Sequence, residues 1–416
     1  MRYFFCAILA ALLATVPAAA QFSTGNGPAP TPLVSQGHPA TWVFAYKFGA
    51  ASFPSTPSDH DRPCPFGGTP RHGGSYSQRY IFATDTQPEL TPQVPDTDLL
   101  GTSDSDPVGA TFSEIYNGDY NYIVWNDQFQ TYPIRNGGNG TGHSKGILAW
   151  NKDGDGLVMQ VSTPGWPGSG SAQHARKVEG NTLGCLTRIS DNLKVAQHFF
   201  MLKLSSVDVA LVLRALANSK VVTKATDLTI WNVSSVQPDA IADAIALFSH
   251  PDTLVTKTDV VLSSHIRLIS KSPSLNVPTW QFVSAELAPA PATAGPALRT
   301  ATWTSATMGN TTGSVACWDE SLKGIPGPII IATDGSWGGK PLKLGISSSH
   351  AKIGITTEAA AAPYVIFSDL NEDGGLSPPA CKRAQNGRGG MFFVIEDKSL
   401  HDSLTVLIPK QATEPN

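Results

Sequence analysis

Residues 142–150 read Gly-His-Ser-Lys-Gly-Ile-Leu-Ala-Trp, a His-x-Lys motif that runs directly into an apolar stretch typical of a buried β-strand. A second His-x-Lys motif opens residues 350–355, His-Ala-Lys-Ile-Gly-Ile, 207 positions later (350 minus 143). Residues two apart in a strand point to the same face, so each His should lie beside its Lys. The spacing is about half of the chain, which predicts two similar halves that meet at one site.

The paired motifs suit the chemistry of a phosphodiester. Lysine side chains can neutralise the non-bridging oxygens as charge builds in the transition state. One neutral histidine can attack phosphorus, and a second, protonated histidine can donate to the leaving oxygen. This scheme needs neither a metal nor a cofactor. Neighbouring positive charges lower the pKa of histidine, so keeping one imidazolium favours acidic conditions.

The remaining pattern predicts a mixed α/β fold. Short apolar runs between Gly- and Pro-rich turns predict strands at 41–47, 78–84, 120–126, 146–150, 157–162, 327–333 and 391–395. Helices are predicted at 206–217 and 238–250, and 190–204 is a further candidate helix. We therefore divide the chain into an N-terminal half, 21–205, with the first motif and a C-terminal half, 206–416, with the second.

Residues 1–20 have the pattern of a secretory signal peptide. Arg2 precedes the apolar run 4–16, and the small residues 18–20 form a cleavage site. No later segment reaches the roughly 18 apolar residues of a membrane span. We expect a secreted or periplasmic protein, or a lysosomal one in a eukaryote, with no membrane partner. The cysteines beyond residue 20 predict up to two disulfides and leave three pairings open: Cys64, Cys185, Cys317 and Cys381.

The charge balance constrains the ligand. The chain has 29 Lys and Arg against 33 Asp and Glu, a formal net charge of −4. Proteins that bind DNA at neutral pH are usually basic. At lower pH the 10 histidines become charged and carboxylates begin to protonate, so the sign can reverse. The composition fits a protein that handles DNA only if it works in acid.

Several segments resemble the deoxyribonuclease II family, and they occur in the family's order. Residues 141–169, TGHSKGILAWNKDGDGLVMQVSTPGWPGS, resemble the segment with its first catalytic motif, and 347–355, SSSHAKIGI, resemble the second. Further similar segments are 41–49 (TWVFAYKFG), 122–128 (YIVWNDQ), 196–198 (AQH), 367–375 (FSDLNEDGG) and 386–394 (NGRGGMFFV). The resemblance covers nearly all of the chain after residue 20, although Ala196 replaces the family's glycine before Gln197.

The resemblance implies a phospholipase D-like fold with two pseudo-symmetric halves, each a central β-sheet flanked by helices. It implies metal-independent acid endonuclease activity on DNA that leaves 3′-phosphate ends. The implied catalytic residues are His143, Lys145, His350 and Lys352. By analogy with phospholipase D-like enzymes, His143 is the expected nucleophile and His350 the expected acid. The implied supporting residues are Asn126, Gln197, Asp369, Asn371 and Arg388; homodimerisation stays open.

Other functions remain as alternatives. Phospholipase D enzymes carry an Asp shortly after the motif Lys, but neither GILAW after Lys145 nor IGITT after Lys352 contains one. This argues against a lipid hydrolase. Two alternatives are kept: a phosphodiesterase or phospholipase D-like enzyme that acts on a lipid or small substrate, and a non-catalytic secreted DNA-binding protein. His198 is a candidate near-site residue. Trp166 could stack on a base, although packing in the core is the more common role of such a residue.

Overall fold

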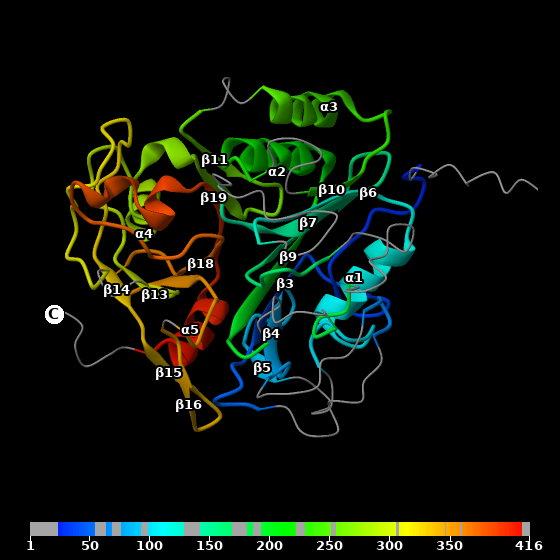
Figure 1. Ribbon diagram of the computed structural model, residues 1–416, viewed down its shortest axis with the longest axis horizontal. Coiled ribbons are helices and arrows are strands. Elements are labelled where there is room, and N and C mark those ends of the chain that lie inside the picture. The colour runs from blue at the N-terminus through cyan, green and yellow to red at the C-terminus, as the bar shows by residue number, and fades with distance from the viewer. Residues whose placement is uncertain are drawn as a thin grey trace, which may run out of the picture.

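A computed structural model describes residues 24–54, 64–68, 76–92, 99–128, 142–168, 181–185, 193–221, 229–250, 255–304, 308–345, 347–357 and 360–409. The predicted signal peptide lies outside these residues. Two large β-sheets pack against each other through their inner faces (Figure 1). The ring of Phe367 in the second sheet stacks on Phe44 and Phe200 in the first, with centroid distances of 4.6 and 4.7 Å. The two halves of the chain therefore share one core.

Over the described residues, the first sheet has eight strands in the order β10-β6-β7-β8-β9-β3-β4-β5. Their bounds are Thr229–Asn232, Asn121–Asn126, Lys145–Trp150, Gly156–Val161, Gln197–Leu204, Trp42–Lys47, Tyr80–Thr84 and Thr91–Pro92. The small strands β1 (Leu33–Ser35) and β2 (His38–Pro39) form a separate pair. The His143 motif thus enters the sheet at the start of β7.

In the part of the chain that the structure describes, the second sheet has seven strands in the order β11-β12-β19-β18-β17-β13-β14. Their bounds are Lys257–Val261, Arg267–Lys271, Gly390–Glu396, Tyr364–Ser368, Ile353–Thr356, Leu298–Ala301 and Ile329–Ile331. The hairpin of β15 (Asp334–Trp337) and β16 (Lys340–Lys343) stands apart from it. The His350 motif ends at Lys352, directly before β17.

The two sheets repeat the same arrangement. Reversed, the second order reads β14-β13-β17-β18-β19-β12-β11, which lines up with β10-β6-β7-β8-β9-β3-β4. The strands from β13 to β12 pair antiparallel, as those from β6 to β3 do, but the edges differ, because β14 is parallel to β13 and β10 is antiparallel to β6. In the first sheet Gly146 pairs with Gln160, and in the second Ile353 pairs with Phe367, so both partners are shifted by 207 residues. The spacing between the motifs is therefore a property of the fold.

Helices cover both sheets (Figure 1). α1 (Pro107–Asn117) packs Val108, Phe112 and Ile115 on the outer face of the first sheet. α4 (Thr279–Glu286) does the same on the outer face of the second sheet. α2 (Ser206–Asn218) and α5 (Lys398–Leu407) contribute to the shared core, and α3 (Asp239–Ala246) packs on α2. The chain is therefore mixed α/β, as predicted.

Most predicted elements are confirmed, with one clear error. The candidate helix at 190–204 is wrong where the structure describes it, from residue 193 on, because 197–204 form the central strand β9. Phe199 packs in the cluster beneath α1 and Phe200 in the core between the sheets, so alternate residues are buried on opposite faces. A strand buried on both faces loses the polar alternation by which strands are recognised in sequence.

Two disulfides connect distant parts of the chain. The disulfides join Cys64 to Cys185 and Cys317 to Cys381, which selects one of the three pairings left open by the sequence. The division at residue 205 stays a prediction; strand β10, which follows it, lies in the first sheet. Within the described ranges, no helix has the length and apolar character needed to cross a membrane.

Candidate active site

Each His-x-Lys motif is held by a backbone bond from the opposite half. The amide of His143 donates to the carbonyl oxygen of Gly389 at 2.8 Å, and the amide of His350 donates to Ala196 at 2.8 Å. Each contact belongs to a parallel β-bridge, and the two bridges lie just before the equivalent strands β19 and β9. These bridges place both motifs at the boundary between the two sheets.

The imidazole of His143 is oriented by a carbonyl group. Its Nδ1 lies 2.9 Å from the carbonyl oxygen of Asp369. A ring nitrogen that faces a carbonyl must carry the proton, so the neutral ring has its lone pair on Nε2. That Nε2 is 3.9 Å from a carboxylate oxygen of Asp127. The tautomer inferred from this hydrogen bond is the one that a nucleophile attacking through Nε2 requires.

Asp127 joins the charged groups of the first motif. Its carboxylate accepts from Lys145 Nζ at 2.6 Å and from an Arg388 nitrogen at 3.1 Å. Arg388 also donates to the carbonyl oxygen of Gly142 at 2.6 Å. Burial alone would raise the pKa of Asp127, but its electrostatic interactions with His143, Lys145 and Arg388 lower the value to about 2. The carboxylate is therefore ionised even in mild acid.

The second motif has different neighbours. The imidazole of His350 stacks on the indole of Trp303, with ring centroids 5.6 Å apart and planes at 17°. Burial, followed by the charges of Lys352, Lys145 and Lys47, lowers the pKa of His350 to about 3. Burial, followed by the charge of Lys145, lowers the pKa of Lys352 to about 7.

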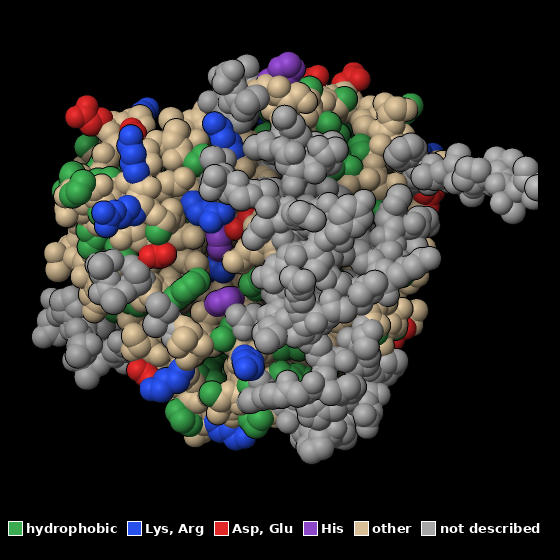
Figure 2. All heavy atoms as spheres, viewed as in Figure 1, with side chains coloured by type: hydrophobic (Ala, Val, Ile, Leu, Met, Phe, Trp, Pro, Cys, Tyr) green, Lys and Arg blue, Asp and Glu red, His purple; other side chains and the backbone are tan. Residues whose placement is uncertain are grey.

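The electrostatic effects cross from one motif to the other. Burial lowers the pKa of His143 well below its usual value, and the charge of Lys352 in the other half adds to this effect. The charge of Lys145 acts on His350 in turn. Figure 2 shows histidine side chains together with Lys and Arg side chains at the centre of one face. The four motif residues therefore belong to one positively charged site.

Two of the supporting residues predicted from the sequence touch this site. Asp369 holds His143 through its carbonyl oxygen, and its carboxylate accepts from the amide of Met391 at 3.0 Å. Burial raises the pKa of the Asp369 carboxyl to about 7, so it is largely protonated in acid. Arg388 holds Asp127, as described above. Both residues come from segments of the second half that pack against the first motif.

The described hydrogen bonds of the other supporting residues go elsewhere. Asn126 donates to the carbonyl oxygen of Trp166 at 3.0 Å and so holds the end of β6. Gln197 accepts from the hydroxyl of Ser162 at 2.5 Å. Asn371 is buried, and within the described ranges its Oδ1 has no hydrogen-bond partner. These contacts place Asn126 and Gln197 in the framework that carries the motifs.

The structure adds Asp127 and Trp303 to the site and gives the candidate residue His198 a contact within it. His198 accepts the amide hydrogen of Lys352 on Nδ1 at 3.1 Å, so it positions the second motif, as the candidate role from the sequence suggested. Asp127 and Trp303 were not identified from the sequence. Asp127 follows Asn126 in a segment that already resembled the family, which was an available signal. Nothing in the sequence near Trp303 distinguishes it.

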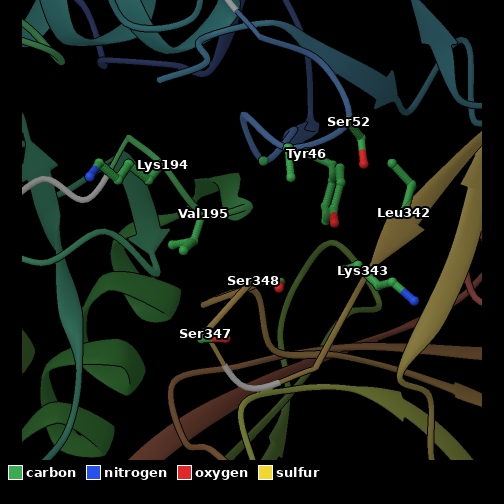
Figure 3. A pocket seen from close by; sticks show the side chains of 10 residues that line it. Tyr46, Ser52, Lys194, Val195, Leu342, Lys343, Ser347 and Ser348 are labelled. Atoms are coloured by element: carbon green, nitrogen blue, oxygen red, sulfur yellow. The ribbon is translucent and has the colours of Figure 1, made fainter. Parts of the chain in front are cut away.

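A small cavity lies between the halves, beside the loop that leads to His350 (Figure 3). Its volume is about 90 Å³, and Tyr46, Lys194, Lys343 and Ser348 are among its lining residues. The hydroxyl of Tyr46 is hydrogen-bonded to the Ser349 side chain. Within the described ranges, no group of three or more His, Cys, Asp or Glu side chains is arranged to hold a metal ion.

Comparison with known families supports the interpretation of this site. The family model described as deoxyribonuclease II matches residues 65–288, more than half of the 416-residue chain. The match includes the first His-x-Lys motif and ends before the second. A search among curated proteins gives no match. On the family match, the chain belongs to the deoxyribonuclease II family and is a hydrolase that acts as a deoxyribonuclease.

Proposed function

We propose that the protein is a metal-independent acid endonuclease with a phospholipase D-like fold, which cleaves DNA and leaves 3′-phosphate ends. One observation carries this proposal: two His-x-Lys motifs, at equivalent positions in two similar sheets, share one positively charged site. The lysines would neutralise the phosphate while one histidine acts as the nucleophile and the other first as acid and then as base.

In the first step, His143 acts as the nucleophile. Its Nδ1 proton is held by the carbonyl oxygen of Asp369, so the Nε2 lone pair is free to attack phosphorus. A P–N bond forms while the bond from phosphorus to the 5′ oxygen breaks. The imidazolium of His350 gives its proton to that oxygen as it departs. The carboxylate of Asp127 stabilises the positive charge that develops on His143.

In the second step, a water molecule replaces the histidine on phosphorus. The neutral His350 takes a proton from this water as the P–O bond forms and the P–N bond breaks. The product keeps the phosphate on its 3′ oxygen, and both histidines return to their starting protonation states. No electron donor or further reactant is required. Lys145 follows His143 by two residues, and Lys352 follows His350 by two residues. The two ammonium groups would hold the non-bridging oxygens during both steps.

The surroundings of His350 and Lys352 favour activity in acid. The pKa of His350 is lowered to about 3, so its imidazolium fraction decreases about tenfold for each further pH unit. The pKa of Lys352 is lowered to about 7, so this side chain loses its charge as the pH rises through that value. Both pKa values are lowered, so both side chains are charged in acid and lose their charge as the pH rises. The negative charge of bound DNA raises both pKa values and extends activity to milder acid.

Plasmid nicking between pH 4 and pH 8, with and without EDTA, tests the proposal. We expect cleavage near pH 5 that EDTA does not reduce, with 3′-phosphate ends that a 3′-phosphatase removes. His143→Ala serves as the inactive control, with the far-UV circular dichroism of the wild type. A requirement for magnesium with a maximum near pH 8 would contradict the proposed mechanism.

We also propose that the protein is exported. Two disulfides join segments far apart in the sequence, and such bonds persist in oxidising compartments. Mass spectrometry of the protein from culture medium or periplasm should find a mature chain that begins at Gln21. Recovery of the full chain in the cytosol alone would contradict this.

A further inference from the structure

Trp303 lies at a position in the second half where the first half has a carboxylate. In the first sheet Asn126 pairs with Lys145, and Asp127 comes next. In the second sheet Ala301 pairs with Ile353, which puts Thr302 opposite Lys352, and Trp303 comes next. Equivalent backbones thus carry a buried charged residue beside one histidine and an aromatic residue beside the other. The site is symmetric in its histidines and asymmetric in what surrounds them.

Trp303 combines exposure with a fixed backbone. It is 37% exposed and is the one aromatic residue among the exposed large hydrophobic side chains of the described ranges. Thr302 accepts the amide hydrogen of Glu372 at 3.2 Å, and Thr304 forms a parallel bridge with Glu372. Glu372 is itself buried. Both neighbours of Trp303 are therefore anchored, while its indole projects to the surface over His350.

We propose that Trp303 is a base-stacking residue that holds the nucleotide on the 3′ side of the cleaved phosphate. This inference rests on the proposed function. One indole face stacks on the imidazole of His350, the group assigned to protonate the leaving 5′ oxygen. The nucleotide attached to that oxygen must lie on the same side of the phosphate. The exposed part of the indole offers its base an aromatic surface, which accepts any base because every base has a π face.

Stacking on Trp303 requires a base that is free on at least one face. Bases inside a duplex are stacked on both sides, so they must be unstacked before they can reach the indole, at an energetic cost. Single-stranded DNA has less of this cost. The proposal therefore adds a preference for single-stranded or locally melted DNA, which the sequence left open.

The test uses short single-stranded oligonucleotides with one cleavable phosphodiester between methylphosphonate linkages. Three substrates carry a base on both sides, an abasic residue on the 3′ side, or an abasic residue on the 5′ side. For the wild type, the 3′ abasic substrate should have a KM about tenfold higher, and the 5′ abasic substrate should change little. Trp303→Ala should raise KM about tenfold on the intact substrate and have no added effect on the 3′ abasic one.

Two matched variants complete the design. Trp303→Phe keeps a flat aromatic ring and should retain most of the affinity. Ile325→Ala removes another exposed apolar side chain, 40% exposed and on a loop paired with Thr293 and Gly295, and should leave all three KM values unchanged. Equal losses for Trp303→Ala on intact and 3′ abasic substrates would overturn the proposal, as would an effect confined to the 5′ abasic substrate.

A role through His350 alone would also overturn the proposal. It predicts that Trp303→Ala lowers kcat on every substrate and shifts the pH profile, with KM unchanged. Fluorescence anisotropy measures the binding of the same oligonucleotides to His143→Ala, and this measurement is independent of catalysis. If the wild type cleaves no substrate, the proposed function fails. The binding data still test Trp303 in that case, because an affinity that does not depend on the 3′ base would overturn its proposed role.

Discussion

The environments of His143 and His350 differ more than their backbones do. Asp127, ionised and paired with Lys145 and Arg388, lies beside His143, whereas Trp303 lies flat against His350. The strands that carry these residues have the same order and the same pairing. The fold therefore places two equal motifs together. Their surroundings become unequal because the segment after β6 carries Asp127, whereas the segment after β13 carries Trp303. A nucleophile and an acid can then be distinct within a repeated framework.

The two halves also share a buried lysine at equivalent positions. Lys47 on β3 donates from Nζ to the carbonyl oxygens of Phe48, Ser77 and Leu193. Lys271 on β12 donates to Asn386 and Arg388 in the same way. The two lysines are equivalent, since they pair with Gln197 and Gly390 at the starts of β9 and β19. Each buried ammonium group thus fixes the position of nearby loops by hydrogen bonds to their carbonyl oxygens.

The largest expected effect separates the two histidines by their roles. Thymidine 3′-(4-nitrophenyl phosphate) has a leaving group that departs without protonation. His350→Ala should lose about a thousandfold on DNA but still release a burst of 4-nitrophenolate equal to the enzyme concentration, with phosphohistidine accumulating. His143→Ala should give no burst. A burst from His143→Ala and none from His350→Ala would reverse the assignment.

The next effect tests the buried carboxylate beside His143. Asp127→Asn leaves Lys145 and Arg388 without a counter-charge in a buried site, which should lower the free energy of unfolding by about 3 kcal/mol. The measurement is urea unfolding at pH 7. Asp259→Asn is the matched control, because its pair with Arg267 is about a quarter exposed and should contribute less than about 1 kcal/mol. Equal losses in the two variants would contradict the assigned role of Asp127.

A smaller effect concerns the lysine of the second motif. The lowered pKa of Lys352, about 7, means that the side chain is charged below this pH and neutral above it. Arginine stays charged throughout this range. Between pH 6 and pH 8 the rate of Lys352→Arg should therefore fall about tenfold less than that of the wild type. Parallel pH profiles would show that Lys352 does not titrate in this range.

The smallest effect tests whether DNA extends over the cavity beside His350. Lys194→Ala should raise KM for a long single strand less than about threefold, and it should reduce the slope of log affinity against log salt by about one. A dinucleotide substrate should be unaffected. Lys398→Ala, which removes an exposed lysine paired with Asp402 on α5, serves as the control. An unchanged salt slope would place the DNA elsewhere.

Local patterns predicted much of the fold. Strands that run directly into turns, such as β7 and β8, were clear because apolar runs between turn residues form a local signal. Strand β9 was not, because it is buried on both faces and its sequence lacks alternation. Trp166 shows the same limit at the level of one residue. Considered as a base-stacking candidate, it is fully buried and donates to the carbonyl oxygen of Asn181.

The sequence by itself determined the two motifs, their spacing and the mixed α/β class, because residue identity and periodicity are local properties. It also indicated the family, which the comparison confirmed. Only the tertiary structure decided that His143 lies beside Asp127 and Arg388, and that Trp303 covers His350. These contacts join residues up to 261 positions apart, and strand pairing between distant segments determines such distances. A pattern repeated after 207 residues can predict two equal motifs in one site, but only packing shows how their surroundings differ.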